Sequence, residues 1–223
     1  MLKRVFIYLV VLSKFFSRQN LNNNLLKEVE ILNKKNTKNN ILNIGAGGEL
    51  SKIVKMITNG NLVNIDIDEN RAPDMVMDAT DLKFENESFD AIFLMEVLEH
   101  ISEPQLAISE IYRTLKKDGL LVMSSPFVFG LHDKPYDFFR YTKYGLAYLL
   151  KDFSDVKIVQ RNDYVHTIIV LVARLMKADA NSDKIIGAIL FVVVLILYPF
   201  LWVLSKLIKS DNISTGYFVL AVK

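Results

Sequence analysis

Short apolar runs alternate with segments of helical length between residues 41 and 160. The runs that predict strands are Ile41–Ile44, Leu62–Ile65, Asp74–Met77, Asp90–Leu94, Leu120–Ser124 and Val156–Gln160. Helices are expected between them, at Leu50–Thr58, Glu103–Leu115 and Thr142–Leu150. Strands and helices that alternate at this spacing form right-handed parallel βαβ units. The pattern therefore predicts an α/β fold with a mostly parallel sheet.

A strongly apolar part of the chain follows, from residue 164 to residue 215. Val165–Met176 is apolar apart from a histidine and an arginine, and Ile185–Leu204 contains no charged residue. An uncharged segment of this length is enough to cross a bilayer as a helix, although we expect Pro199 to divide it into shorter pieces. The last apolar run, Tyr217–Val222, predicts a final strand.

The position of residues 164–215 between two strands limits how they can meet a membrane. If the final strand pairs with the sixth, the intervening residues must return to the side they left, either as a re-entrant hairpin or as helices in the interface. Lys184, Lys206 and Lys209 flank the apolar run as membrane anchors do. The alternative is a single crossing, with a C-terminal tail that forms no strand.

The N-terminal 40 residues predict a separate segment. Val5–Leu12 is apolar and lies between basic residues, but it is too short to span a bilayer and no small-residue cleavage site follows. A basic amphipathic helix in the membrane interface fits this pattern, as does a terminal helix that packs on the domain or stays disordered. Asn22–Asn24 and Asn33–Asn40 predict polar linkers on either side of a helix near Leu25–Leu32.

Composition narrows the class of protein. A chain of 223 residues suits one catalytic domain with an appendage. The formal net charge of +2 and the lack of a basic stripe disfavour a nucleic-acid partner. No cysteine is present, which excludes disulfides and thiolate metal sites, and the three histidines are too scattered to predict a metal site. A hydrophobic share of 51% is high for a soluble enzyme and favours a membrane partner.

The first candidate chemistry follows the first two strands. Gly45-Ala46-Gly47-Gly48 comes directly after an apolar run, and Asp66 ends the next one. Glycines allow a backbone to approach a ligand closely, and an acid at the second position can accept both hydroxyls of a ribose. The alternative is structural: the glycines would form only a turn, and Asp66 would cap a helix. The dinucleotide fingerprint is incomplete, because Leu50 stands where a third glycine is required.

Motifs further along the chain distinguish between nucleotide-binding families. These are Met77–Leu82 (MDATDL), Ser88–Leu94 (SFDAIFL), Val97–His100 (VLEH) and Tyr112–Gly119 (YRTLKKDG). Together with the glycine loop, they resemble the class I S-adenosylmethionine-dependent methyltransferases of the type 11 group. The resemblance implies a Rossmann-like sheet of seven strands, mostly parallel, with an antiparallel last strand. The methyltransferase domain would then comprise residues 41–163 and 216–223, with residues 164–215 as a hydrophobic helical insertion and residues 1–40 as the N-terminal helix and linker.

The resemblance also implies a set of cofactor contacts for S-adenosyl-L-methionine. The residues that match the family positions are Asn43, Gly45, Ala46, Gly47, Asp66, Ile67, Asp78, Ala79 and Met95. Asn43 stands where the family often has an acid, so one charged contact to the cofactor's amino group is expected to be lost or replaced.

The acceptor side is expected in the run Gly130–Thr142, which follows the fifth strand. A similar loop occurs in type 11 methyltransferases associated with cell-envelope glycan and lipid synthesis. The candidate catalytic residues are His132 as a base, Arg140 as a clamp for an anionic group, Tyr141, Glu96 and His100. An internal ion pair between Asp137 and Arg140 is the alternative, with His132 only ordering the loop.

The sequence thus predicts a membrane-associated methyltransferase whose catalytic domain faces the cytoplasm. Its acceptor would be a small or lipid-linked molecule, as used in cell-envelope glycan or lipid synthesis. The alternatives are a protein that binds the cofactor without turnover and an NAD-dependent oxidoreductase.

Overall fold

The computed structural model describes residues 2–35 and 39–223, which fall into two compact units. The helical unit comprises Met1–Leu21, Phe127–His132 and Gln160–Gly216, and the sheet unit comprises Asn22–Pro126, Asp133–Val159 and Tyr217–Lys223. The first 21 residues therefore group with residues 160–216, and the domain division that the sequence predicted stays a prediction.

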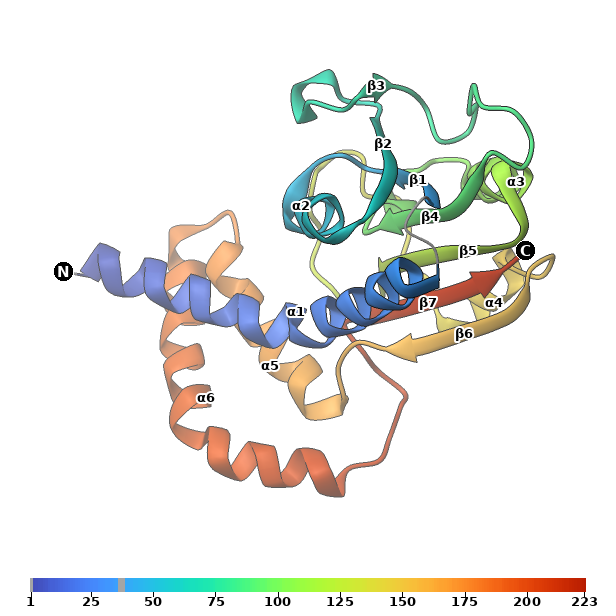
Figure 1. The fold of residues 1–223 in the computed structure, drawn as a ribbon. Coiled ribbons are helices and arrows are strands. Elements are labelled where there is room, and N and C mark those ends of the chain that lie inside the picture. The colour runs from blue at the N-terminus through green and yellow to red at the C-terminus, as the bar shows by residue number, and fades with distance from the viewer. Residues whose placement is uncertain (1, 36–38) are drawn as a thin grey trace. The chain divides into compact units, whose positions relative to one another are not determined.

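The sheet unit contains seven strands in the order β3-β2-β1-β4-β5-β7-β6 (Figure 1). Their bounds are β1 Asn39–Ile44, β2 Gly60–Asp66, β3 Met75–Val76, β4 Phe89–Met95, β5 Leu115–Pro126, β6 Ser154–Gln160 and β7 Gly216–Val222. The pairs β1/β2, β2/β3, β1/β4 and β4/β5 are parallel. The order reverses at β1, and ligands of such sheets bind at the carboxyl ends of the strands beside this point.

The last strand runs in the opposite direction, as the sequence predicted. The backbone N–H of Lys223 donates to the carbonyl of Gly119 at 3.0 Å, and that of Asp118 donates to the carbonyl of Lys223 at 3.2 Å. The end of β7 therefore lies beside the beginning of β5. Ser154 Oγ donates to the carbonyl of Val222 at 3.1 Å, which places the beginning of β6 there as well.

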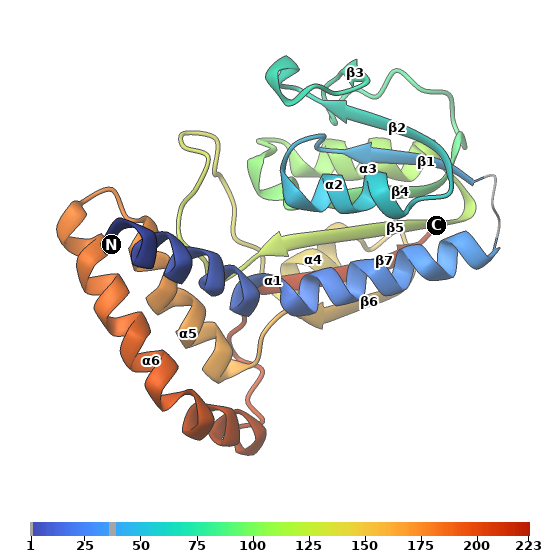
Figure 2. The same ribbon diagram turned by 60° about the vertical axis from the view of Figure 1, so that its left-hand side comes forward.

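Helices cover both faces of the sheet. Their bounds are α2 Gly48–Ile57, α3 Pro104–Thr114 and α4 Lys143–Leu149, and two short 3-10 helices, η1 Glu69–Arg71 and η2 Leu98–His100, follow β2 and β4. Figures 1 and 2 show α2 and the C-terminal part of α1 on one face, and α3 and α4 on the other. Central strands covered on both faces have near-continuous apolar runs. Accordingly, every residue of Ala91–Met95 is buried.

The N-terminal helix differs from the prediction. Helix α1 runs without interruption from Leu2 to Lys35, so Asn22–Asn24 is not a linker. Leu21, Leu25, Val29 and Leu32 recur at helical spacing through the asparagines, and all four are buried. This continuous apolar stripe outweighs the modest helix preference of asparagine.

The helical unit contains α5 Tyr164–Arg174, the 3-10 helix η3 Leu175–Lys177 and α6 Asn181–Leu207. Helix α5 packs against α6 around a core of Leu9, Phe16, Val165, Ile169, Val170, Ala173, Met176 and Phe191. Gly187 allows η3 to approach α6 closely, since a β-carbon there would lie 2.7 Å from Cβ of Leu175.

Helix α6 is continuous through Pro199, so the expected division into shorter pieces is wrong. A proline removes only one backbone N–H, and therefore one hydrogen bond, from a helix. The helix can continue where tertiary packing compensates for that lost hydrogen bond. Leu195, Tyr198 and Leu201, on both sides of the proline, pack against the core of the helical unit. Among the described residues, α6 is the one helix long and apolar enough to cross a membrane, with a mean hydropathy of 2.7 over its most apolar window.

Candidate functional site

The glycine loop after β1 has a backbone that other residues would strain. Gly45 has φ of +93°, and its N–H donates to the carbonyl of Ile65 at 2.8 Å. A β-carbon at Gly45 would lie 2.4 Å from Cγ2 of Val97. Gly48 opens α2 with φ of +82°, and a β-carbon there would meet nothing within 4 Å. The loop therefore packs tightly at its first glycine and is open at its last.

Asp66 ends β2 directly beside this loop. Its Oδ2 accepts a hydrogen bond from the N–H of Ala46 at 2.9 Å, and its Oδ1 accepts one from the N–H of Asp68 at 3.0 Å. Each carboxylate oxygen has two lone pairs, so each can accept one further bond, as a pair of ribose hydroxyls requires. Ile67, the next residue, has 72% of its surface exposed.

The segment that contains Asp78 and Ala79 lies on the other side of Asp66. The N–H of Met77 donates to the carbonyl of Asp66 at 3.0 Å. Asp78 Oδ1 accepts from both the N–H and the hydroxyl of Thr80, each at 2.8 Å, and Ala79 is buried. Direct hydrogen bonds thus connect the glycine loop to Asp66, and Asp66 to Met77, which precedes Asp78 and Ala79. The prediction that these residues bind one cofactor molecule stays a prediction.

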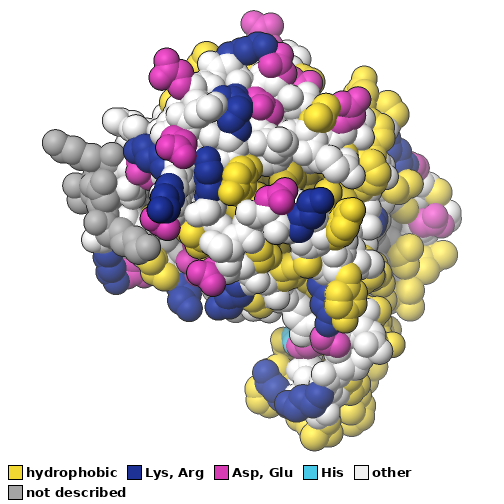
Figure 3. All heavy atoms as spheres, turned by 90° about the vertical axis from the view of Figure 1, so that its right-hand side faces the viewer, with side chains coloured by type: hydrophobic (Ala, Val, Ile, Leu, Met, Phe, Trp, Pro, Cys, Tyr) yellow, Lys and Arg dark blue, Asp and Glu magenta, His cyan; other side chains and the backbone are white. Residues whose placement is uncertain are grey.

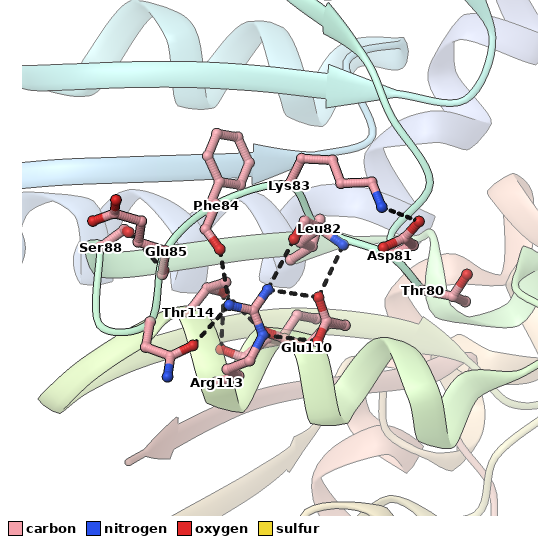
Figure 4. Close-up of polar contacts among 12 residues, drawn as sticks. Thr80, Asp81, Leu82, Lys83, Phe84, Glu85, Ser88, Glu110, Arg113 and Thr114 are labelled. Carbon is pink, nitrogen blue, oxygen red and sulfur yellow. Dashed lines mark hydrogen bonds and ion pairs between the residues drawn. The ribbon is translucent and has the colours of Figure 1, made fainter.

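Glu110 and Arg113 of α3 hold the chain that follows Asp78 (Figure 4). Arg113 donates to the carbonyls of Leu82 and Phe84, both at 2.8 Å, and Glu110 Oε2 accepts from the N–H of Leu82 at 2.9 Å. The hydrogen bond from Arg113 is the main cause that lowers the pKa of Glu110 below its ordinary value. Sequence reasoning placed this arginine only within a family motif and did not foresee its role as a support.

Asn43 is buried under the glycine loop and is engaged within the protein. Its amide nitrogen donates to Ser51 Oγ at 2.9 Å and to Asn64 Oδ1 at 3.0 Å. Asn64 donates in turn to Asp74 Oδ2 at 2.7 Å, and this hydrogen bond is the main cause that lowers the pKa of Asp74. Asn43 therefore links β1, α2 and β2, and its predicted contact with the cofactor stays a prediction.

Sequence reasoning missed Arg71, which lies over the glycine loop. A β-carbon at Gly47 would be 2.8 Å from Cδ of Arg71. Arg71 Nε is 3.7 Å from Asp68 Oδ2, and its Nη2 is 3.7 Å from Asp133 Oδ2. Asp68 is only three residues from Arg71, but Gly47 and Asp133 lie far from it in the sequence, so no spacing rule points to those two contacts.

The carboxyl end of β4 carries Met95 and Glu96. Met95 is buried, and Glu96 has φ of +56°, a left-handed conformation that is uncommon for a residue other than glycine. Ser124, at the corresponding end of β5, accepts from the N–H of Glu96 at 3.0 Å and donates from its hydroxyl to Glu96 Oε1 at 2.8 Å. Such strain is often found at functional sites.

His100 has a defined tautomer. Its Nδ1 lies 2.6 Å from the carbonyl oxygen of Tyr136, and because a carbonyl can only accept, Nδ1 carries the proton. In the neutral ring, Nε2 then carries the lone pair. Nε2 is 3.8 Å from Glu99 Oε1 and 4.0 Å from Asp133 Oδ2. Nε2 is therefore the basic nitrogen of the neutral ring, and two carboxylates lie near it.

Arg140 pairs with Asp137, the alternative that the sequence left open. Its Nη1 and Nη2 lie 2.5 and 2.6 Å from the two oxygens of Asp137, whose side chain is 3% exposed. The hydrogen bond that Arg140 donates to Asp137 is the main cause that raises the pKa of Arg140. Both terminal nitrogens are thus engaged, which disfavours a clamp for a substrate anion. Next to this pair, burial raises the pKa of Tyr141.

His132 belongs to the helical unit, whereas Asp133 and the rest of the candidate acceptor loop belong to the sheet unit. The ring of His132 meets that of Phe129 edge to face at 5.7 Å, and its Nδ1 lies 3.3 Å from the carbonyl oxygen of Gly130. Gly130–Thr142 belongs to one connection, between the end of β5 at Pro126 and the start of α4 at Lys143, and this connection contributes residues to both units. The catalytic role predicted for His132 stays a prediction.

A known family model matches the part of the chain that contains the glycine loop and the central strands. Residues 42–123 match the family model described as a methyltransferase domain, Methyltransf_11. This match covers the glycine loop, Asp66, Asp78 and the carboxyl end of β4. No curated protein matches the chain significantly.

Several solved structures share the fold at low sequence identity. Phosphoethanolamine N-methyltransferase 2 of Haemonchus contortus, solved with S-adenosyl-L-methionine, superposes with a TM-score of 0.59 at 18% identity, over 92% of this chain and 52% of that one. A SAM-dependent methyltransferase from Archaeoglobus fulgidus gives 0.57 at 18% identity, over 91% and 94%. The cyclase SpnF gives 0.56 at 16% identity, over 89% and 80%. The chain thus spans about half the length of the Haemonchus enzyme.

Three observations point to the same fold: the strand order, the reversed last strand and the family match. Residues 42–123 form a class I methyltransferase domain whose cofactor is S-adenosyl-L-methionine.

Proposed function

We propose that this chain is a membrane-associated methyltransferase that modifies an amphipathic acceptor, such as a lipid-linked molecule of cell-envelope glycan or lipid synthesis. The observation that carries the proposal is the apolar surface of α6, in the same chain as the methyltransferase domain. Its most exposed hydrophobic residues include Ile185, Ile189, Ile196, Phe200 and Leu207, each at least 60% exposed. Exposed apolar surface of this extent is typical of membrane or protein contacts.

Charge favours a membrane over a protein partner. The segments of the helical unit carry ten basic and four acidic residues, a formal net charge of +6, whereas the rest of the chain carries 17 basic and 21 acidic residues, a net charge of −4. Figure 3 shows yellow hydrophobic patches at the right and lower edges of one face, beside Lys and Arg side chains. Apolar surface next to basic side chains fits an anionic leaflet, such as the cytoplasmic one.

The connections of the helical unit favour helices that lie in the interface. Strand β7 follows α6 in the chain and lies between β5 and β6 in the sheet. The chain must therefore return to the sheet after α6, so α6 cannot end on the far side of a membrane. A hairpin of two spans would need a second long helix, but the 11 residues of α5 extend only about 16 Å. The hydrocarbon core is about 30 Å thick. An arrangement with α6 in the plane of the membrane meets both constraints.

Within the sheet unit, each group has a distinct task. The glycine loop and Asp66 would hold the cofactor, which supplies an electrophilic methyl group when bound. Alignment of the two reactants then provides much of the rate, since oriented groups react far faster than free ones. Where the acceptor atom carries a proton, His100 Nε2 can remove it. The hydrogen bond from Nδ1 to the carbonyl oxygen of Tyr136 orients the ring.

Cofactor binding without turnover is a second candidate function. Its specific support is Asn43, which stands where the family often has an acid and whose amide is engaged with Ser51 and Asn64. The cyclase SpnF also has this fold, so the fold alone does not define the reaction.

The test incubates the purified full-length protein with methyl-labelled S-adenosylmethionine and either lipid or aqueous extracts. We expect label in the lipid fraction, and loss of that label with Asp66→Ala. Label only in aqueous products would overturn the lipid acceptor. Calorimetric binding of S-adenosylhomocysteine without transfer to either extract would support the second candidate instead.

A further inference from the structure

A small polar pocket lies inside the helical unit, among side chains that are otherwise apolar. Its volume is about 210 Å³, and it is lined by residues of α1, α6 and the beginning of α5. The residues that matter most are Asn20, Asp163, His166, Tyr198, Trp202 and Lys206. This pocket is built entirely within one unit and contains none of the groups assigned above to methyl transfer.

A chain of hydrogen bonds compensates the acidic side chain of the pocket. Asp163 caps α5, and its Oδ1 accepts from the N–H of His166 at 2.9 Å. The ring Nδ1 of His166 lies 2.9 and 2.8 Å from the two carboxylate oxygens of Asp163. On the other side, His166 Nε2 lies 3.3 Å from the hydroxyl of Tyr198. Asp163 is the one acid among the lining residues, and it is already engaged.

Lys206 has no such partner. Its ammonium lies 5.5 Å from the centre of the Trp202 ring and forms no hydrogen bond or ion pair with the residues that the structure describes. The pocket therefore presents one uncompensated positive charge next to an aromatic wall. Tyr198, Trp202 and Lys206 follow each other at intervals of four residues, so they lie on the same side of α6.

We propose that this pocket binds the phosphate headgroup of an anionic lipid, with the tails of the lipid along the exposed part of α6. A cation flanked by Trp and Tyr suits the level of the headgroups in a bilayer. Phe200, Val203 and Leu207 are exposed in the same part of α6, where acyl chains would lie. The inference rests on the membrane association proposed above and adds a defined lipid site to it.

Trp202 provides a direct measurement, because it is the only tryptophan of the chain. The full-length protein is titrated with short-chain phosphatidylglycerol below its micelle concentration, and the fluorescence of Trp202 is recorded. We expect a saturable change. Lys206→Gln should weaken the affinity about fivefold, as the loss of one lysine near a phosphate predicts. Lys157→Gln is the matched control, since Lys157 is an exposed lysine of β6 that does not line the pocket, and it should bind as the natural protein does.

Equal affinities of the natural protein and Lys206→Gln would overturn the proposal, as would equal binding of short-chain phosphatidylcholine. The same fluorescence titration with inorganic phosphate, and with a polyprenyl phosphate in neutral vesicles, distinguishes a lipid phosphate from a free one. Saturation by inorganic phosphate at the same concentration would overturn the lipid assignment. A response of Trp202 to phosphatidylglycerol and to the polyprenyl phosphate, but not to inorganic phosphate, supports it.

The membrane association itself is measured separately, by flotation with phosphatidylglycerol vesicles. If the protein floats with these vesicles but its Trp202 fluorescence shows no preference for phosphatidylglycerol over phosphatidylcholine, only the proposed lipid pocket is contradicted. A protein that does not float at all would contradict the proposed membrane association.

Discussion

The guanidinium of Arg113 forms two hydrogen bonds with the carboxylate of Glu110, one turn earlier in α3, at 2.8 and 2.7 Å. The same guanidinium donates to the carbonyls of Leu82 and Phe84 and to Asn86 Oδ1. A single side chain thus attaches the segment between β3 and β4 to a helix of the sheet unit. This segment follows Asp78 and Ala79, so the contact also bears on cofactor binding.

Arg113→Ala should destabilise the domain by about 2 kcal/mol, since charged hydrogen bonds contribute about 1.5 to 3 kcal/mol each where partners are left unsatisfied. Chemical denaturation measures the free energy of unfolding. Lys117→Ala, an exposed lysine four residues away, is the control and should change it little. Arg113→Ala should also bind S-adenosylhomocysteine more weakly. An unchanged free energy of unfolding would show that the hydrogen bonds of Arg113 contribute nothing to stability.

The Glu110 carboxylate predicts a pH dependence of stability. Its folded pKa is lowered from an ordinary value of 4.5, chiefly by Arg113. The stability that it contributes is therefore full above the unfolded pKa and is lost as the pH falls through the folded pKa. Unfolding free energies of the natural protein and Glu110→Gln should differ at pH 7 and converge in acid. A difference that grows in acid would contradict this sign.

Gly45→Ala should destabilise the glycine loop for two reasons. A φ of +93° costs about 1 to 3 kcal/mol for a residue with a side chain, and the new β-carbon would lie 2.4 Å from Val97. Gly48→Ala separates the two effects, because Gly48 has a similar φ but open space around it. We expect Gly48→Ala to be the milder change and Val97→Ala to restore part of the stability of Gly45→Ala. Equal losses for both glycines would exclude the collision.

The sequence predicted most of the sheet because its signals are local. Apolar runs of strand length, the glycines after the first run and an acid at the end of the second all depend on neighbouring residues. All seven predicted strands are present, and the reversed β7 agrees with the family resemblance. Asp66 and Met77, which precedes Asp78, are hydrogen bonded to each other because parallel strands place their carboxyl ends at one edge.

What the sequence did not show depends on contacts between distant segments. The asparagines of Asn22–Asn24 suggested a linker, but the apolar stripe through them keeps α1 helical. Arg71 crosses to Asp133 between two loops, and no pattern marks either residue as a partner of the other. The ion pair of Asp137 and Arg140 was one of two alternatives, and only the folded geometry distinguishes them.

His100→Gln tests the assigned proton acceptor. General bases typically contribute about a hundredfold to ten-thousandfold to a rate, so kcat should fall by that factor where the acceptor must lose a proton. Binding of S-adenosylhomocysteine should stay unchanged, because His100 is assigned to the acceptor and not to the cofactor. A loss of binding as large as the loss of turnover would instead indicate a structural role for His100 in holding Tyr136.

Ile196→Asp tests the membrane face of α6 without disturbing its packing. Ile196 has 73% of its surface exposed, so the folded protein loses almost no contact. At a membrane, the loss of a buried isoleucine alone is worth about 1.5 to 3 kcal/mol, which predicts a tenfold or larger decrease in vesicle binding. Ile196→Leu keeps the apolar surface and should bind vesicles normally, and both variants should bind S-adenosylhomocysteine as the natural protein does. If Ile196→Asp floats with vesicles as well as Ile196→Leu, α6 does not enter the membrane at this position, and its apolar face must instead contact a protein.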